Sequence, residues 1–130
     1  MERIRVDVTV SNLADRQRSL TLPVLVDTGV TYATLPREVA DALGLEPFET
    51  RRVRLADGHA ESWPIGAILI RIKGREGPAL TWIGPEGGSA LLGAVTLEEL
   101  ALGVDPSGRC LIPTTSYLVS PIDVIEGGSL

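Results

Sequence analysis

The sequence has very little of the residues that build covalent cross-links and metal sites. Cys110 is the only cysteine and His59 the only histidine among its 130 residues. A single cysteine excludes an intrachain disulfide, and one cysteine with one histidine cannot form a typical metal centre within the chain. A Cys–His nucleophilic pair is chemically conceivable, but neither residue lies in a setting typical of one. We therefore expect no metal and no cofactor, and we expect Cys110 to be a small core residue on a strand.

Long apolar runs and an excess of positive charge are also missing. No apolar stretch approaches the ~18 residues that span a bilayer, and the charged start of the chain, Met1 to Arg5, lacks the hydrophobic region of a signal peptide. The formal net charge is -5, so the chain has no general attraction for nucleic-acid phosphates. These absences predict a cytoplasmic protein that binds neither membranes nor nucleic acid.

The length and the apolar pattern indicate a single strand-rich domain over residues 1–130. Residues 4–10 alternate apolar and polar side chains, and the apolar run 20–26 follows a polar turn, so this pair predicts a hairpin. Pro23 favours an edge position or a bulge in the second strand. Further strands are expected at residues 51–55, 62–72, 79–83, 89–93, 110–112 and 117–125, with a flexible tail over 125–130.

Two short helices are predicted from their start and stop signals. Pro36 suits a first helical position and Gly44 lies just beyond the end, which predicts a helix over 36–43. Thr96 and Glu99 have the spacing of a capping box, so a second helix is expected to begin at Thr96 and to close at Gly103.

Several other features have simple structural explanations. The Asp57-Gly58 dipeptide between two predicted strands is a strong hairpin-turn signal. The glycines of residues 84–88 lack the Lys-Ser/Thr of a phosphate-binding loop, so we expect an ordinary mobile loop there. The arginines at positions 51, 52 and 54 fit a solvated strand face better than a patch for an acidic partner. Trp63 and Trp82 are expected to pack, although a tryptophan beside a mobile hairpin could also line a pocket.

The segment Val24-Leu25-Val26-Asp27-Thr28-Gly29 is the strongest functional candidate. Three apolar residues suited to a buried strand lead directly into a carboxylate, which is costly to place there unless hydrogen bonds hold it. Thr28 can donate a hydrogen bond, and Gly29 permits a tight turn. Taken alone, the pattern also fits a turn aspartate that accepts bonds from local backbone donors.

A second motif, Leu91-Leu92-Gly93, raises the odds of a catalytic site. It is an apolar strand that ends in glycine and precedes the second predicted helix. An Asp-Thr-Gly strand, a hairpin, and then an apolar-apolar-Gly strand with a helix occur in this order in the retroviral-type (retropepsin-like) aspartic proteases. The chain resembles the small cellular and bacterial members of this family over roughly residues 4–112.

The resemblance implies an all-β fold, a closed barrel-like acid-protease lobe with two short α-helices. It also implies an aspartic endopeptidase that works as a homodimer, because the reaction needs two carboxyls and this chain supplies one such loop. In such a dyad two carboxyls about 3 Å apart share one proton. The ionised partner takes a proton from water while the protonated partner polarises the carbonyl of a peptide substrate. Activity is then expected to be greatest at mildly acidic pH.

The resemblance assigns roles to further positions as well. Thr28 would hydrogen-bond across the dimer and stiffen the two loops, and Gly29 would leave room for the substrate backbone. The hairpin tip would be a flap that closes over the peptide, and the glycine-rich loop would line side-chain pockets. The flap residues are Asp57, Gly58 and His59, and the pocket-loop residues are Pro85, Glu86 and Gly87.

The chain departs from the family pattern in two places. Val30 follows the Asp-Thr-Gly motif at a position where the family usually has a smaller alanine. The hairpin tip has one glycine and a charge, whereas retroviral flaps are glycine-rich and apolar. His59 can therefore be either a solvated residue or a substrate contact. The alternative function is a catalytically silent dimeric protein-interaction module with the same fold. By analogy with the family, residues 117–125 are the candidate strand for the dimer sheet.

Overall fold

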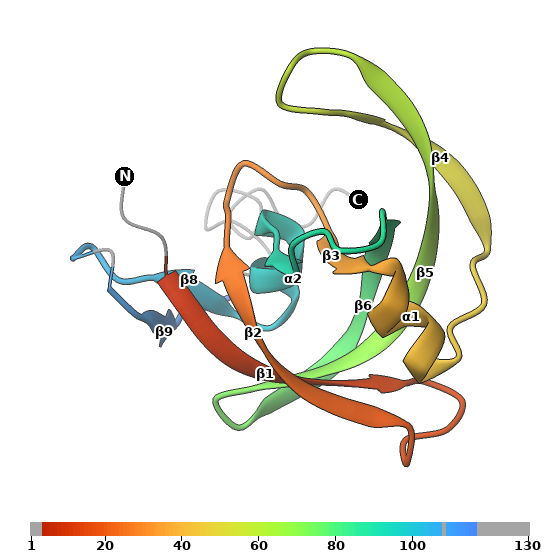
Figure 1. The fold of residues 1–130 in the computed structure, drawn as a ribbon. Coiled ribbons are helices and arrows are strands. Elements are labelled where there is room, and N and C mark those ends of the chain that lie inside the picture. Colours follow the sequence, from red (N-terminus) through yellow and green to blue (C-terminus); the bar gives the residue numbers. More distant parts are fainter. Residues whose placement is uncertain (1–3, 108, 117–130) are drawn as a thin grey trace, which may run out of the picture.

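A computed structural model describes residues 4–107 and 109–116, which form nine strands and two short helices (Figure 1). Their bounds in chain order are β1 (Ile4–Asn12), β2 (Ser19–Val26), β3 (Ala33–Pro36), α1 (Arg37–Leu43), β4 (Glu49–Arg54), β5 (Ala60–Ile72), β6 (Arg75–Gly84), β7 (Leu91–Leu92), α2 (Ala94–Glu99), β8 (Leu102–Val104) and β9 (Leu111–Pro113).

Six strands close into a barrel. The large sheet has the order β1-β2-β7-β3-β6-β5-β4, and a second pairing of β1 with β5 closes the first six of these strands into a ring that leaves β4 outside. β1 pairs with β2 along its length and with β5 through Thr9–Asn12. The barrel is therefore closed by β1, which has a hydrogen-bonded neighbour on each side. β8 and β9 form a separate two-stranded sheet. The predicted all-β barrel with two short helices is therefore confirmed.

The interior of the barrel is filled by the alternating side chains of these strands. In β1, Val8 and Val10 are buried while Arg5 and Asp7 are exposed, as the sequence pattern predicts. Each fully buried aliphatic side chain of this kind contributes about 1.5–3 kcal/mol to folding. The largest fully buried apolar side chains are Leu35, Leu43, Ile65, Ile68, Ile70, Ile72, Leu92, Val8 and Val10.

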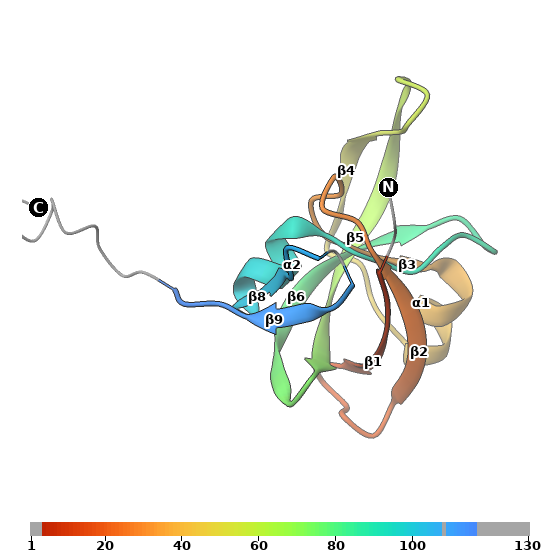
Figure 2. The same cartoon turned by 90° about the vertical axis from the view of Figure 1, so that its left-hand side faces the viewer.

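The β4–β5 hairpin lies outside the ring and projects from the barrel (Figure 2). β5 pairs with β4 over Ala60–Ile65 and with β6 over Ile65–Ile72, so its second half belongs to the barrel and its first half to the hairpin. The turn falls at the predicted Asp57-Gly58, where Gly58 has a φ of 94° that favours glycine.

Helix α1 is close to the prediction. It begins at Arg37, with Pro36 as the residue before its first turn and not the first helical residue. Gly44 ends it in the left-handed conformation, with a φ of 69°, and donates its N–H to the carbonyl of Asp41 at 3.0 Å.

The predicted start of α2 is wrong. The helix begins at Ala94 and ends at Glu99, and Thr96 is a buried residue inside it with no capping role. The reason is tertiary: the N–H groups of Ala94 and Val95 donate to the carbonyls of Val30 and Thr31 at 2.8 and 3.0 Å. Because these N–H groups at the start of the helix are already satisfied, a side-chain cap is not needed.

Three further differences come from short or shifted strands. β3 was not predicted, because four buried residues between β7 and β6 show no periodic pattern. β6 begins at Arg75, since the tight turn lies at Lys73 and Gly74, both with positive φ. Cys110 lies half-buried before β9 and not on a core strand, and its thiol contacts Asp105 Oδ2 at 3.4 Å.

Pro23 lies at an edge, as predicted, because β2 pairs on that side with β7 only through Leu25 and Val26. The predicted strand 117–125 and the tail 125–130 lie outside the described residues. No helix within the described ranges is long and apolar enough to cross a membrane.

Candidate active site

The Asp27 loop begins where β2 leaves the barrel wall. The main-chain N–H of Asp27 donates to the carbonyl of Leu92 at 2.9 Å, which continues the parallel pairing of β2 with β7. The Gly29 N–H donates to Asp27 Oδ1 at 3.0 Å, and the Val30 N–H donates to the Asp27 carbonyl at 3.0 Å. Asp27 is half-buried while Thr28 and Gly29 are exposed. The Gly29 N–H therefore orients the carboxylate, while the other two bonds fix the main chain of the loop.

The backbone of Gly93 packs so closely against this loop that a residue with a Cβ would not fit. A Cβ at this position would lie 2.6 Å from the carbonyl oxygens of Val30, Thr31 and Tyr32. The glycine of the apolar-apolar-Gly motif is thus required by close approach of two backbones and not by its φ, which is -96°. The structure brings together the two motifs that the sequence singles out.

A cavity of about 500 Å³ lies beside Asp27. Residues of the loop after β2, of the β4–β5 hairpin and of the segment 84–91 line it. The charged residues among them are Asp27, Arg52 and Arg54, and the apolar and aromatic ones include Val30, Pro36, Val53, Leu55, Trp63, Trp82 and Leu91. Asp27 is therefore the one carboxylate that the described residues contribute to this largely apolar cavity.

An aromatic cluster supports the wall of the cavity. The rings of Tyr32 and Trp82 lie 5.6 Å apart, and Trp63 packs edge-on against Trp82 at 6.5 Å. The Arg51 guanidinium lies 5.9 Å from the centre of the Tyr32 ring, and its Nη1 donates to the Tyr32 hydroxyl at 3.2 Å. Arg51 also pairs with Glu49. Arg52 and Arg54 are exposed, as predicted for a solvated strand face, and the Arg51 side chain is 40% exposed while it contacts Tyr32 and Glu49.

The predicted flap residues form the tip of the β4–β5 hairpin. The Gly58 N–H donates to the Leu55 carbonyl and the Leu55 N–H to the His59 carbonyl, each at 2.9 Å. Asp57 Oδ1 accepts from the His59 N–H at 3.0 Å. In the described chain Asp57, Gly58 and His59 are exposed and do not line the cavity, whereas the hairpin residues just before them do.

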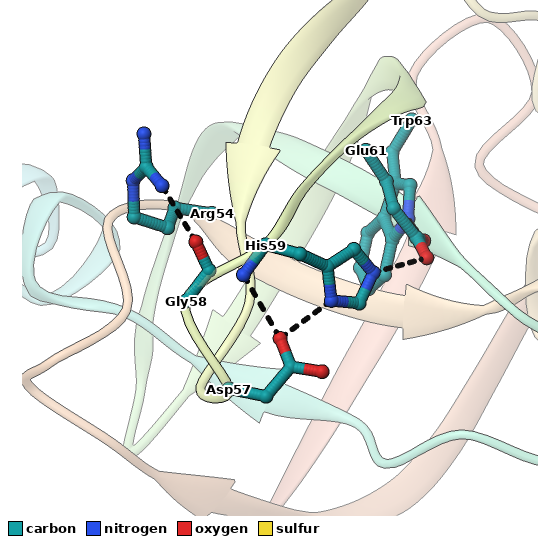
Figure 3. Close-up of polar contacts among 6 residues, drawn as sticks. All are labelled: Arg54, Asp57, Gly58, His59, Glu61 and Trp63. Atoms are coloured by element: carbon teal, nitrogen blue, oxygen red, sulfur yellow. Dashed lines mark hydrogen bonds and ion pairs between the residues drawn. The ribbon is translucent and has the colours of Figure 1, made fainter.

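The His59 side chain lies between two carboxylates (Figure 3). Its Nδ1 is 2.5 Å from Asp57 Oδ1, and its Nε2 is 2.9 Å from Glu61 Oε2. The other oxygen of Glu61 accepts from Trp63 Nε1 at 2.8 Å. The Glu61 and Asp57 carboxylates raise the pKa of His59 above its ordinary value, while bonds from Trp63 and His59 lower the pKa of Glu61.

The predicted pocket loop is anchored to α1. Both carboxylate oxygens of Glu38 accept from the Gly87 N–H, at 3.0 and 3.1 Å. Pro85 lines the cavity, whereas Glu86 and Gly87 do not. The sequence gives no local signal for Glu38, because 49 residues separate it from its partner.

Within residues 4–107 and 109–116, no group of three His, Cys, Asp or Glu side chains is placed to hold a metal ion.

Comparison with known proteins agrees with this geometry. A sequence profile of the aspartyl protease family matches residues 6–94. Comparison with curated proteins gives no significant match. The chain is similar in structure to the EIAV protease in complex with the inhibitor HBY-793, with a TM-score of 0.58 and 21% identity over 85% of this chain and 93% of that one.

Two further solved structures are similar. The simian foamy virus (mac) protease has a TM-score of 0.53 and 16% identity over 74% of this chain and 93% of its own. The retroviral protease-like domain of Ddi1 from Leishmania major has a TM-score of 0.59 and 15% identity, covering 87% and 89% of the two chains. With the profile match over most of its length, the chain belongs to the aspartyl protease family, and its barrel is the retropepsin-like fold.

Proposed function

We propose that this protein is an aspartic endopeptidase whose active centre is an Asp27/Asp27′ dyad formed by two copies of the chain. The observation that carries the proposal is the placement of Asp27. Its carboxylate accepts a hydrogen bond from the Gly29 N–H beside a cavity of about 500 Å³ and is the one carboxylate that the described residues contribute there. Acid–base hydrolysis needs a second carboxyl within about 3 Å, so a second copy is required.

The chemistry follows from a shared proton. The ionised carboxylate of the dyad accepts a proton from water as the water oxygen attacks the carbonyl carbon of the peptide. The protonated carboxyl donates a hydrogen bond to the carbonyl oxygen, on which negative charge develops. When the tetrahedral intermediate collapses, the C–N bond breaks and the amine leaves with a proton from the dyad.

The hairpin and the cavity wall fit an extended peptide. The β4–β5 hairpin offers a strand that stands outside the barrel, and a peptide can pair with such an edge by main-chain hydrogen bonds. Thr28 and Gly29 are assigned to loop support, Asp57, Gly58 and His59 to the flap, and Pro85, Glu86 and Gly87 to a pocket loop.

Peptide cleavage by the wild type and by Asp27→Asn tests the proposal. A peptide library assayed from pH 3 to 7 should yield cleavage by the wild type, greatest in mild acid, and a loss of roughly 10²–10⁴-fold or more in Asp27→Asn. Asp7→Asn is the matched control, because Asp7 is exposed on β1. If the wild type cleaves nothing while remaining dimeric, the protein is instead a catalytically silent interaction module.

A further inference from the structure

The tip of the β4–β5 hairpin carries a histidine that contacts a carboxylate through each of its ring nitrogens. The Nδ1 atom faces Asp57 in the turn, and Nε2 faces Glu61 on β5. A neutral imidazole has only one N–H, so both contacts are hydrogen bonds only when His59 is the cation. Figure 3 shows the ring lying between the two carboxylates.

Glu61 links this histidine to the wall of the cavity. One of its carboxylate oxygens contacts His59 Nε2, and the other accepts a hydrogen bond from the indole N–H of Trp63. The Trp63 ring packs edge-on against Trp82, and a Cβ on Gly84 would lie 3.2 Å from Trp63 Cζ3. The indole therefore rests directly on the backbone of β6 beside the cavity. The contacts run without interruption from the hairpin tip to the cavity wall.

The charged groups around His59 make its contacts depend on its protonation state. From the turn it faces Asp57, and from its own strand it faces Glu61. From β4, Arg54 reaches the same turn, where its Nη1 donates to the Gly58 carbonyl at 2.6 Å, and Figure 3 shows it on the other side of the hairpin. Two carboxylates thus flank the imidazole, and the Arg54 guanidinium is bonded to the backbone of the turn.

We propose that His59 and Glu61 are positioning residues: an imidazolium clasp that holds the hairpin tip and the Trp63 indole in one arrangement beside the cavity. The clasp is complete when His59 is a cation and Glu61 is an anion. It opens when His59 becomes neutral, because Asp57 or Glu61 then faces a ring nitrogen without a proton. Its consequence for peptide cleavage rests on the proposed function, whereas the clasp itself does not.

The pH range follows from the directions of the two pKa shifts. The pKa of His59 is raised, chiefly by Glu61 and then by Asp57, so its contribution is complete below its ordinary value of 6.5 and is lost as pH rises through the raised value. The pKa of Glu61 is lowered, chiefly by Trp63 and then by His59, so its contribution is lost only as pH falls through a value below its ordinary 4.5. The clasp is therefore closed in mild acid, where a carboxyl dyad works.

NMR titration of the full-length chain carrying Asp27→Asn tests the clasp without any need for cleavage. We expect the Trp63 indole N–H resonance, assigned with Trp63→Phe, to titrate with the same midpoint as the His59 ring, above pH 6.5. Glu61→Gln keeps an oxygen for the indole but removes the charge, so it should lower the His59 midpoint. Glu76→Gln is the control, because Glu76 pairs with Arg16 and Arg71 and not with His59.

Hydrogen exchange supplies the second readout. His59→Gln should speed amide exchange in residues 55–61 in mild acid by roughly two- to fivefold, the range expected for exposed ionic contacts. His59→Arg keeps a cation at every pH, so it should remove the His59-linked pH dependence of amide protection, measured as exchange rates divided by the intrinsic rates at each pH. The clasp is refuted if the Trp63 indole does not respond to the His59 titration, or if His59→Gln exchanges like its parent. Failure to detect cleavage by the wild type would overturn the proposed function and leave both readouts interpretable.

Discussion

The Asp27 loop lines the cavity and the tip of the β4–β5 hairpin lies beyond its lining, and the two are held by different forces. The loop is fixed by main-chain hydrogen bonds to β7 and α2 and by the close approach of Gly93. The tip is held by a tight turn and by exposed side-chain contacts among Arg54, Asp57, His59 and Glu61. Main-chain contacts do not titrate, whereas carboxylate–imidazole contacts do. The Asp27 carboxylate is thus placed by contacts that do not depend on pH, whereas the contacts at the hairpin tip can respond to pH.

The largest effect is expected from breaking the backing of the Asp27 loop. Gly93→Ala places a methyl group 2.6 Å from three carbonyl oxygens that belong to backbone and cannot rotate away. We expect the free energy of unfolding, measured by chemical denaturation, to fall by about 3 kcal/mol or more, which is the upper end of the range for overpacking.

Gly66→Ala is the control for this substitution. The atoms nearest to a Cβ at that position are 3.8 Å away, an ordinary contact, so its stability should change little. Equal stability of the two variants would show that the loop yields to Gly93→Ala and is not fixed by that approach.

A smaller effect is expected at the loop after β6. Glu38→Ala removes the carboxylate that accepts the Gly87 N–H, so exchange of the Gly87 amide should rise roughly two- to tenfold, the equivalent of one ordinary hydrogen bond. Asp41→Ala, at an exposed position on the same helix, should leave that amide unchanged. An unchanged rate in Glu38→Ala would mean that the loop is ordered by its own turn.

The smallest effect concerns substrate charge. Arg52 and Arg54 are the cations among the described cavity residues, and Arg54 is bonded to the Gly58 carbonyl. Arg52→Gln should therefore lower kcat/KM for peptides with a glutamate near the cleaved bond, relative to matched glutamine peptides, by about two- to fivefold. Arg71→Gln on the distal half of β5 should not alter this ratio. A ratio that Arg52→Gln leaves intact would place the guanidinium away from bound peptide.

The parts of the site that could be predicted are those marked by short sequence motifs. Asp27-Thr28-Gly29 after an apolar strand, Leu91-Leu92-Gly93, and Asp57-Gly58 each carry their own signal, and the structure forms a turn or strand end at each. Long-range contacts were not predictable in the same way. The start of α2 depends on carbonyls supplied by Val30 and Thr31, which no capping pattern reveals.

The surroundings of the cavity show the same limit. Arg51 meets Tyr32 across 19 residues, and Glu38 meets Gly87 across 49. Each pair consists of ordinary surface residue types whose partners are decided by how the barrel closes. The position of Trp63 on the cavity wall likewise follows from the register of β5 with β4, in which Trp63 pairs with Arg51, and from the bond to Glu61.

Subunit mixing tests the shared active centre most directly. Wild type and Asp27→Asn are refolded together in varying ratios, and cleavage per wild-type chain is measured with dimerisation followed by sedimentation. A dyad predicts that mixed dimers are inactive, so activity per wild-type chain falls to about half in an equal mixture and to about a quarter at threefold excess of the variant. Activity per wild-type chain that stays constant at every ratio would show that one chain cleaves alone and would contradict the account.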